Sequence, residues 1–135
     1  LDASALTFEI TETAAIAHMA DAREFIDQLH ALGCRLALDD FGAGFSSYSY
    51  LKLLPVDYVK IDGSFVRELA NDPIDQAIVQ SMSQVAHALG KLTIAEYVED
   101  AGTLELLRRY GIDYAQGFHL GAPSLGLPAV PLYAE

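Results

Sequence analysis

The sequence has few cationic side chains, a single cysteine and no tryptophan. Lys and Arg number 8 against 19 Asp and Glu, which gives a formal net charge of -11. Because proteins hold DNA, RNA and anionic membranes through cationic surfaces, this charge argues against all three as partners. It does not argue against an anionic ligand that is held through metal ions. Cys34 cannot form an internal disulfide bond, and its position before an apolar run favours a buried structural thiol over a nucleophile.

Long apolar runs are also missing. No run approaches the roughly 20 residues of a membrane-spanning helix, and no signal peptide is recognisable. We therefore expect no membrane contact from this segment. The chain has 135 residues, of which 52% are hydrophobic, and this is enough for one folded domain with one core. The first residue is Leu rather than Met, as expected for a piece of a longer protein.

Short apolar runs alternate with amphipathic segments along the chain. Strands are expected at 6–12, 35–40, 56–61, 92–95 and 112–115, and helices at 21–32, 46–54, 72–90 and 103–110. Five strands that alternate with helices predict an α/β fold with a parallel sheet and helical crossovers. Polar residues at the strand ends favour a TIM-type (β/α) barrel, here incomplete, over an open doubly wound sheet. No Gly-rich dinucleotide motif follows the first strand.

A few residues mark the expected ends of helices. Asp21 is the expected N-cap of the first helix. Asp72 and Pro73 are the expected N-cap and first residue of a long helix, whose inner face should include Ile74. The tail, residues 123–135, is rich in Gly and Pro and is expected to be irregular.

Two adjacent acids, Asp39 and Asp40, follow an apolar run directly and precede a glycine-rich turn. Neighbouring carboxylates repel each other, which raises the proton affinity of one of them. A cation between them removes this cost, and Mg²⁺ and Mn²⁺ prefer hard oxygen ligands. The sequence therefore predicts a metal site at the carboxyl end of this strand.

Further polar residues lie at or just beyond the ends of the predicted strands. They are Glu9, Glu12, Lys60, Asp62, Glu96 and Gln116. Because the carboxyl ends of parallel strands meet at one edge, we expect these side chains to converge there. Lys60 adjoins a buried strand end and therefore needs a carboxylate or phosphate neighbour. Its position leaves open whether it forms a structural salt bridge or contacts a ligand.

Five segments, in the same order along the chain, closely resemble motifs of the EAL domain family, bacterial phosphodiesterases that hydrolyse cyclic di-GMP. They are Phe8–Glu12, Asp39–Ser47, Lys60–Val66, Ala95–Glu99 and Gln116–Phe118. The resemblance implies that residues 1–122 are the C-terminal part of such a domain and that 123–135 follow it as a tail. It implies hydrolysis of cyclic di-GMP to linear pGpG with Mg²⁺ or Mn²⁺, with two ions in the intact domain, in the bacterial cytoplasm.

The resemblance also implies roles for single residues. Metal binding or its support would fall to Glu9, Asp39, Asp40 and Asp62. Lys60 would hold the attacking water or the phosphate. Glu96 would act as general base or metal ligand, and Gln116 would orient the water or a neighbouring side chain.

The glycine-rich loop after the paired aspartates has a role of its own in this comparison. Glu12 would brace the loop. The loop residues Phe41, Gly42, Gly44, Ser46 and Ser47 would couple the metal, the substrate and dimer contacts. The resemblance further implies an upstream GGDEF or sensory domain as a possible partner.

The chain departs from the family pattern in two ways. Tyr97 stands where the family usually has glycine, and a bulky ring there could alter the loop or narrow the pocket. The Glu-Ala-Leu segment and an upstream metal-binding asparagine are absent. Five strands cannot close an eight-stranded barrel and leave two unpaired edges. We therefore expect the N-terminal part of the same domain, or a second copy in a homo-oligomer, to cover them.

Two other functions remain as alternatives. The domain could be a receptor that binds cyclic di-GMP without cleaving it, although the retained acids and Lys60 favour the enzyme. An unrelated barrel enzyme could use Lys60 as a Schiff-base amine. The carboxylates expected around Lys60 argue against this chemistry, because they should keep the amine protonated.

Overall fold

The computed structural model describes residues 7–42, 48–117 and 130–131. The strands are β1 (Thr7–Thr11), β2 (Arg35–Phe41), β3 (Tyr58–Ile61), β4 (Leu92–Ala95), β5 (Tyr114–Ala115) and β6 (Val130–Pro131). The helices are α1 (Glu12–Ala17), α2 (Met19–Ala31), α3 (Tyr48–Leu51), α4 (Pro73–Ala88) and α5 (Ala101–Arg109), with 3-10 turns η2 (Gly63–Phe65) and η3 (Leu69–Asn71). In this part of the chain, no helix has the length and apolar character needed to cross a membrane.

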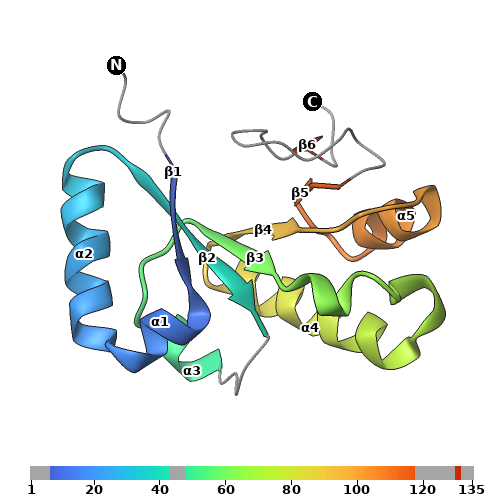
Figure 1. The fold of residues 1–135 in the computed structure, drawn as a ribbon, viewed down its shortest axis with the longest axis horizontal. Helices are drawn as coiled ribbons and strands as arrows, with labels where there is room; N and C mark the ends of the chain where they lie inside the picture. Colours follow the sequence, from blue (N-terminus) through green and yellow to red (C-terminus); the bar gives the residue numbers. More distant parts are fainter. Residues whose placement is uncertain (1–6, 43–47, 118–129, 132–135) are drawn as a thin grey trace.

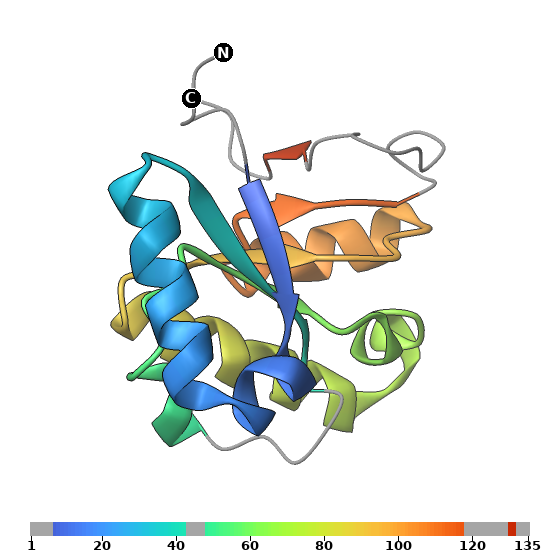
Figure 2. The same ribbon diagram turned by 60° about the vertical axis from the view of Figure 1, so that its left-hand side comes forward.

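All six strands belong to one sheet, in the order β1-β2-β3-β4-β5-β6. Strands β1 to β5 run parallel, each beside its neighbour in sequence, and β6 pairs antiparallel with β5. The sheet curves, and α2, α4 and α5 follow its outer side (Figures 1 and 2). This arrangement is an incomplete barrel, so the predicted fold class is confirmed. The prediction that the whole tail is irregular is wrong at Val130–Pro131, because these residues form β6.

The apolar core lies between the sheet and these helices. Alternate strand residues with at most 1% of their surface exposed form its sheet side: Leu36, Leu38, Val59, Ile61, Ala95 and Ala115. Successive side chains of a strand point to opposite faces. The alternation therefore turns Asp39 and Lys60 away from the helices and toward the interior of the incomplete barrel.

The predicted helix ends are partly confirmed. Asp72 caps α4, since its side chain accepts hydrogen bonds from the backbone N–H groups of Ile74 (2.9 Å) and Asp75 (3.3 Å). The N-cap expected at Asp21 is wrong, because α2 already begins at Met19 and Asp21 lies in its first turn. A separate short helix, α1, precedes it, and the Thr11 side chain caps this helix.

The position predicted for Ile74 is also wrong. Its side chain is 71% exposed, whereas Val79 and Met82 of the same helix are buried. Ile74 precedes Val79 by five residues, which places it about 140° around the helix axis from the buried face. Apolar character alone assigned this residue to the core, but the sheet contacts a different stripe of α4.

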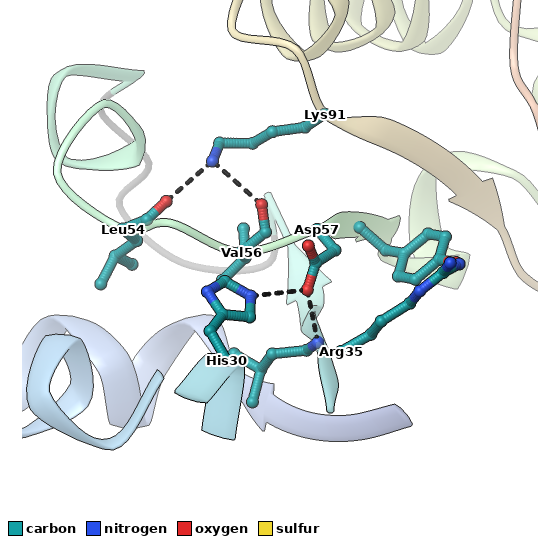
Figure 3. A network of polar contacts seen from close by, with 8 residues as sticks. His30, Arg35, Leu54, Val56, Asp57 and Lys91 are labelled. Carbon is teal, nitrogen blue, oxygen red and sulfur yellow. Dashed lines mark hydrogen bonds and ion pairs between the residues drawn. The ribbon is translucent and has the colours of Figure 1, made fainter. Parts of the chain in front are cut away.

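Polar side chains fix the amino ends of the strands, opposite the edge where the acids were expected (Figure 3). Asp57 forms a hydrogen bond with His30 Nε2 (2.9 Å) and accepts another from the Leu36 backbone N–H (2.8 Å). Lys91 is buried and donates to the carbonyl oxygens of Leu54 (2.8 Å) and Val56 (3.1 Å). Burial lowers the pKa of Lys91. These contacts tie the segment before β3 to its neighbours on both sides.

Replacing Asp72 with alanine should lower the free energy of unfolding by about 1 kcal/mol, because two backbone donors at the start of α4 lose their acceptor. Urea denaturation measures this change. Gln80→Ala, at an exposed position of the same helix, is the matched control and should leave stability within about 0.5 kcal/mol. Equal midpoints for the Asp72 variant and the unchanged protein would contradict the capping role.

Candidate functional site

The carboxyl end of β2 contains a β-bulge that places two acids at one edge. Leu38 pairs with Val59 and Phe41 pairs with Ile61, so Asp39 and Asp40 together oppose Lys60 alone. Asp40 has a φ of 55°, in the left-handed region that residues other than glycine rarely occupy. In a regular strand the two side chains would point to opposite faces. The bulge changes this alternation and lets both carboxylates reach the same rim.

The two aspartates meet a third carboxylate from β4. Single oxygen atoms of Asp39, Asp40 and Glu96 all lie within 4.8 Å of one another, and each residue is partly buried. We call these three residues the acidic triad. Glu96 directly follows β4, which is separated from β2 by β3 in the sheet. Three converging carboxylate oxygens fit a hard divalent cation and offer no soft ligand.

The charges of the acidic triad oppose ionisation. Partial burial and then the neighbouring carboxylate of Asp39 raise the pKa of Asp40. Burial also raises the pKa of Glu96, and Lys60 counteracts this effect only in part. A bound cation would therefore relieve an electrostatic cost that the fold imposes on these groups.

Lys60 supplies a positive charge next to the acidic triad. Its side chain is 8% exposed, and Nζ lies 2.5 Å from Glu9 Oε1 and 2.8 Å from Glu96 Oε1. Burial alone would lower the pKa of Lys60, but hydrogen bonds to Glu9 and Glu96 outweigh it and raise the pKa to about 12. The amine is therefore protonated at neutral pH and cannot serve as a Schiff-base nucleophile there.

The other predicted site residues lie around this centre. Glu9 extends from β1 across β2 to reach Lys60, and it is not a member of the acidic triad. Asp62 caps η2, where it accepts hydrogen bonds from the Ser64 N–H (3.1 Å) and the Ser64 hydroxyl. Gln116 follows β5, and its backbone N–H donates to the carbonyl of Ala95 at 2.9 Å. The metal roles expected for Glu9 and Asp62 stay predictions.

Glu12 lies beneath the start of the glycine-rich loop. It is 1% exposed, and its Oε2 accepts hydrogen bonds from the Gly42 N–H (3.0 Å) and the Tyr50 hydroxyl (2.5 Å). Gly42 has a φ of 95°, and a Cβ there would lie 2.5 Å from the terminal methyl of Met82. The positive φ and the close methyl group explain why glycine stands at 42. The bracing role expected for Glu12 stays a prediction, which its two hydrogen bonds support.

Phe41 ends β2 and is 1% exposed, so it packs in the core rather than facing a ligand. Its ring stacks on Tyr48 with the centroids 6.1 Å apart. Gly44, Ser46 and Ser47, which the sequence assigned to the loop, lie outside the described residues.

Replacing Glu12 with alanine should lower the free energy of unfolding by about 2 kcal/mol, because the variant leaves the partly buried Gly42 N–H and Tyr50 hydroxyl without their acceptor. Urea denaturation measures the loss, and hydrogen exchange across 41–47 measures loosening of the loop. Tyr50→Phe removes one of the two donors and should cost about 1 kcal/mol. Unchanged stability and unchanged exchange in the alanine variant would contradict the bracing role.

Binding of Mn²⁺ should weaken as the pH falls, and it should do so above the range near pH 4 where ordinary carboxylates titrate. The raised pKa values of Asp40 and Glu96 mean that protons compete with the cation at higher pH. Electron paramagnetic resonance of free Mn²⁺ between pH 5 and 7.5 measures this competition. Glu96→Gln, which removes one titrating group, should bind more weakly and depend less on pH. Affinity that stays constant down to pH 5 would refute this electrostatic account.

Comparisons with known proteins place this arrangement in context. Cyclic di-GMP phosphodiesterase PdeB of Shewanella oneidensis is 52% identical over 116 residues, which are 86% of this chain and 14% of that protein. The solved structure of PaMucR phosphodiesterase in complex with c-di-GMP superposes with a TM-score of 0.85 at 38% identity, over 97% of this chain and 51% of that one. The chain thus spans less than a fifth of the length of its curated relative.

A structure of Klebsiella pneumoniae BlrP1 with calcium and cyclic di-GMP has a TM-score of 0.86 at 34% identity, over 97% of this chain and 33% of that one. Another BlrP1 structure holds manganese and cyclic di-GMP. The sequence profile of the EAL domain matches residues 1–123. This match covers most of the chain, and the chain therefore belongs to the EAL domain family.

Proposed function

We propose that this chain is part of an enzyme that hydrolyses cyclic di-GMP to linear pGpG with Mg²⁺ or Mn²⁺. The observation that carries the proposal is the acidic triad, Asp39, Asp40 and Glu96, with the protonated Lys60 2.8 Å from Glu96 at the same rim. A phosphodiester is anionic and resists attack by water. A cation held by these ligands, together with the fixed ammonium group, would neutralise the negative charge of the phosphodiester and ease attack by water.

The residues divide the work according to their chemistry. Asp39, Asp40 and Glu96 would hold the divalent cation, with Glu9 and Asp62 completing or supporting its surroundings in the intact domain. When bound, one or two cations neutralise the phosphate charge and lower the pKa of a coordinated water.

Water then adds to phosphorus while the bond from phosphorus to the ribose 3′ oxygen breaks. The proton of the water passes to a base, and the departing 3′ oxygen takes up a proton from solvent to become a hydroxyl. Glu96 can take that proton if it does not bind the cation, and its raised pKa suits such a role. Lys60 places positive charge beside the phosphate oxygens, where charge increases in the transition state. Gln116 would orient the water from the end of β5.

The edges of the sheet support the proposed partners. Strand β1 stands at one end of the strand order, and Phe8 on it is 40% exposed. We propose that further strands of the same domain, or a second copy of the chain, cover this edge. An upstream GGDEF or sensory domain and a cytoplasmic location remain proposals that follow from the family.

The decisive experiment incubates the natural protein that carries this chain with cyclic di-GMP and Mn²⁺ and follows pGpG by chromatography. Asp39→Asn and Lys60→Met should each lower turnover about 100-fold or more, because each removes charge that stabilises the transition state. Asp27→Asn, on the exposed face of α2, is the matched control and should leave turnover unchanged. Full turnover in the Asp39 variant would refute the metal role. Tight binding of cyclic di-GMP without any cleavage would favour a receptor instead.

A further inference from the structure

The residue after Glu96 has an unusual backbone. Tyr97 has a φ of 61°, in the left-handed region, which is disfavoured for a bulky side chain. Within the described part of the chain, Asp40 is the other residue besides glycine with positive φ. Both positions therefore adjoin or belong to the acidic triad. A strained conformation persists only where surrounding contacts hold it, so the contacts of Tyr97 need an explanation.

The ring of Tyr97 contacts two groups from the segment after β3. Ile61 of β3 pairs with Ala95 of β4, so Gly63 and Tyr97 each follow that pair by two residues. The ring lies directly against Gly63, where a Cβ would be only 2.0 Å from Cδ2 of Tyr97. The guanidinium of Arg67 lies 4.5 Å from the ring centroid, in a cation–π contact.

The other side of the same segment is fixed by β5. The Gln116 N–H donates to the carbonyl of Ala95 and the Val98 N–H donates to the carbonyl of Gln116, both at 2.9 Å. Val98 itself is fully buried. Backbone hydrogen bonds therefore hold the residues on either side of the Glu96–Tyr97 pair from β5, and the Tyr97 ring holds the pair from β3.

We propose that Tyr97 is a positioning residue for Glu96. Its ring, in contact with Gly63 and Arg67, holds the left-handed backbone conformation that directs the Glu96 carboxylate toward the other two acids of the triad and Lys60. The inference rests on one part of the proposed function, the cation site. It concerns the direction of the Glu96 carboxylate and not the hydrolysis itself. These two contacts explain why a bulky residue can occupy a position whose backbone favours glycine.

The competing explanation is that the ring only covers surface. Tyr97 is 44% exposed, so loss of the ring removes little of the core in either case. The two explanations differ in what happens to Glu96. If Tyr97 positions Glu96, loss of the ring should weaken cation binding and increase hydrogen exchange at the Val98 amide with little change in melting temperature.

The experiment compares variants of the natural protein that carries this chain. Tyr97→Ala removes the ring but keeps a residue that disfavours positive φ, and Gly63→Ala displaces the ring while keeping Tyr97. Tyr97→Phe keeps both ring contacts and serves as the conservative rescue. Gly102→Ala in α5 is the matched glycine control, because its Cβ would meet only a side-chain oxygen at 3.3 Å.

Mn²⁺ affinity is measured by electron paramagnetic resonance, and exchange of residues 95–98 by mass spectrometry without metal. Tyr97→Ala and Gly63→Ala should weaken Mn²⁺ binding about tenfold or more, as expected for a group that orients a metal ligand. Both should speed exchange at 95–98, whereas Tyr97→Phe and Gly102→Ala should match the unchanged protein. Mn²⁺ affinity within twofold of the unchanged protein in both ring-displacing variants would overturn the proposal.

Three further outcomes also test the proposal. If the ring-displacing variants fail to fold, Arg67→Gln removes only the cation–π contact, and unchanged exchange at 95–98 in that variant overturns the proposal. If the unchanged protein binds Mn²⁺ without hydrolysing cyclic di-GMP, the proposed function fails and the affinity series still tests Tyr97. If it binds no Mn²⁺, the exchange measurement decides, because it needs no metal.

Discussion

The contact between Lys60 and Glu96, 2.8 Å long and largely buried, is the interaction on which the site depends. It joins the end of β3 to the loop after β4 and sets one ammonium group against several carboxylates. One cation cannot neutralise Glu9 and the acidic triad together. Burial, and to a smaller extent the remaining repulsion, raises the pKa values of Asp40 and Glu96. The fold therefore leaves negative charge at this rim that a divalent cation can compensate.

Backbone strain is concentrated at the same rim. Asp40 and Tyr97 take up left-handed conformations beside or within the acidic triad. At Asp40 the strain accompanies the bulge that brings two neighbouring acids to one place. At Tyr97 it occurs directly after Glu96, the member of the triad that follows β4. Local strain of this kind costs stability, and the surrounding contacts must offset it.

The two ends of the sheet differ in what their polar groups do. At the amino ends, Asp57 accepts hydrogen bonds from its neighbours and Lys91 donates to two backbone carbonyl oxygens. These groups satisfy one another and hold the strands in register. At the carboxyl ends, the three carboxylates of the acidic triad converge beside a single ammonium group, that of Lys60. This division between a stabilising end and a reactive end is the usual arrangement of (β/α) barrels.

The alternation of strands and helices could be read from the sequence because hydrophobic periodicity reports local structure directly. Strand β4 was placed correctly, and the N-cap at Asp72 was recognised from its residue type and the proline after it. The start of α2 and the exposure of Ile74 were missed, since they depend on which stripe of a helix meets the sheet.

For the site, the sequence by itself determined which residues carry charge and that they follow strand ends. It could not separate the acidic triad from Glu9 and Asp62, because their oxygen positions depend on the bulge after Leu38 and on where Lys60 points. From the sequence, Tyr97 could be recognised only as a departure from the family pattern. Its contact with Gly63 exists only once β3 and β4 are paired. Side chains far apart in sequence acquire their neighbours from strand register, and tertiary structure alone sets that register.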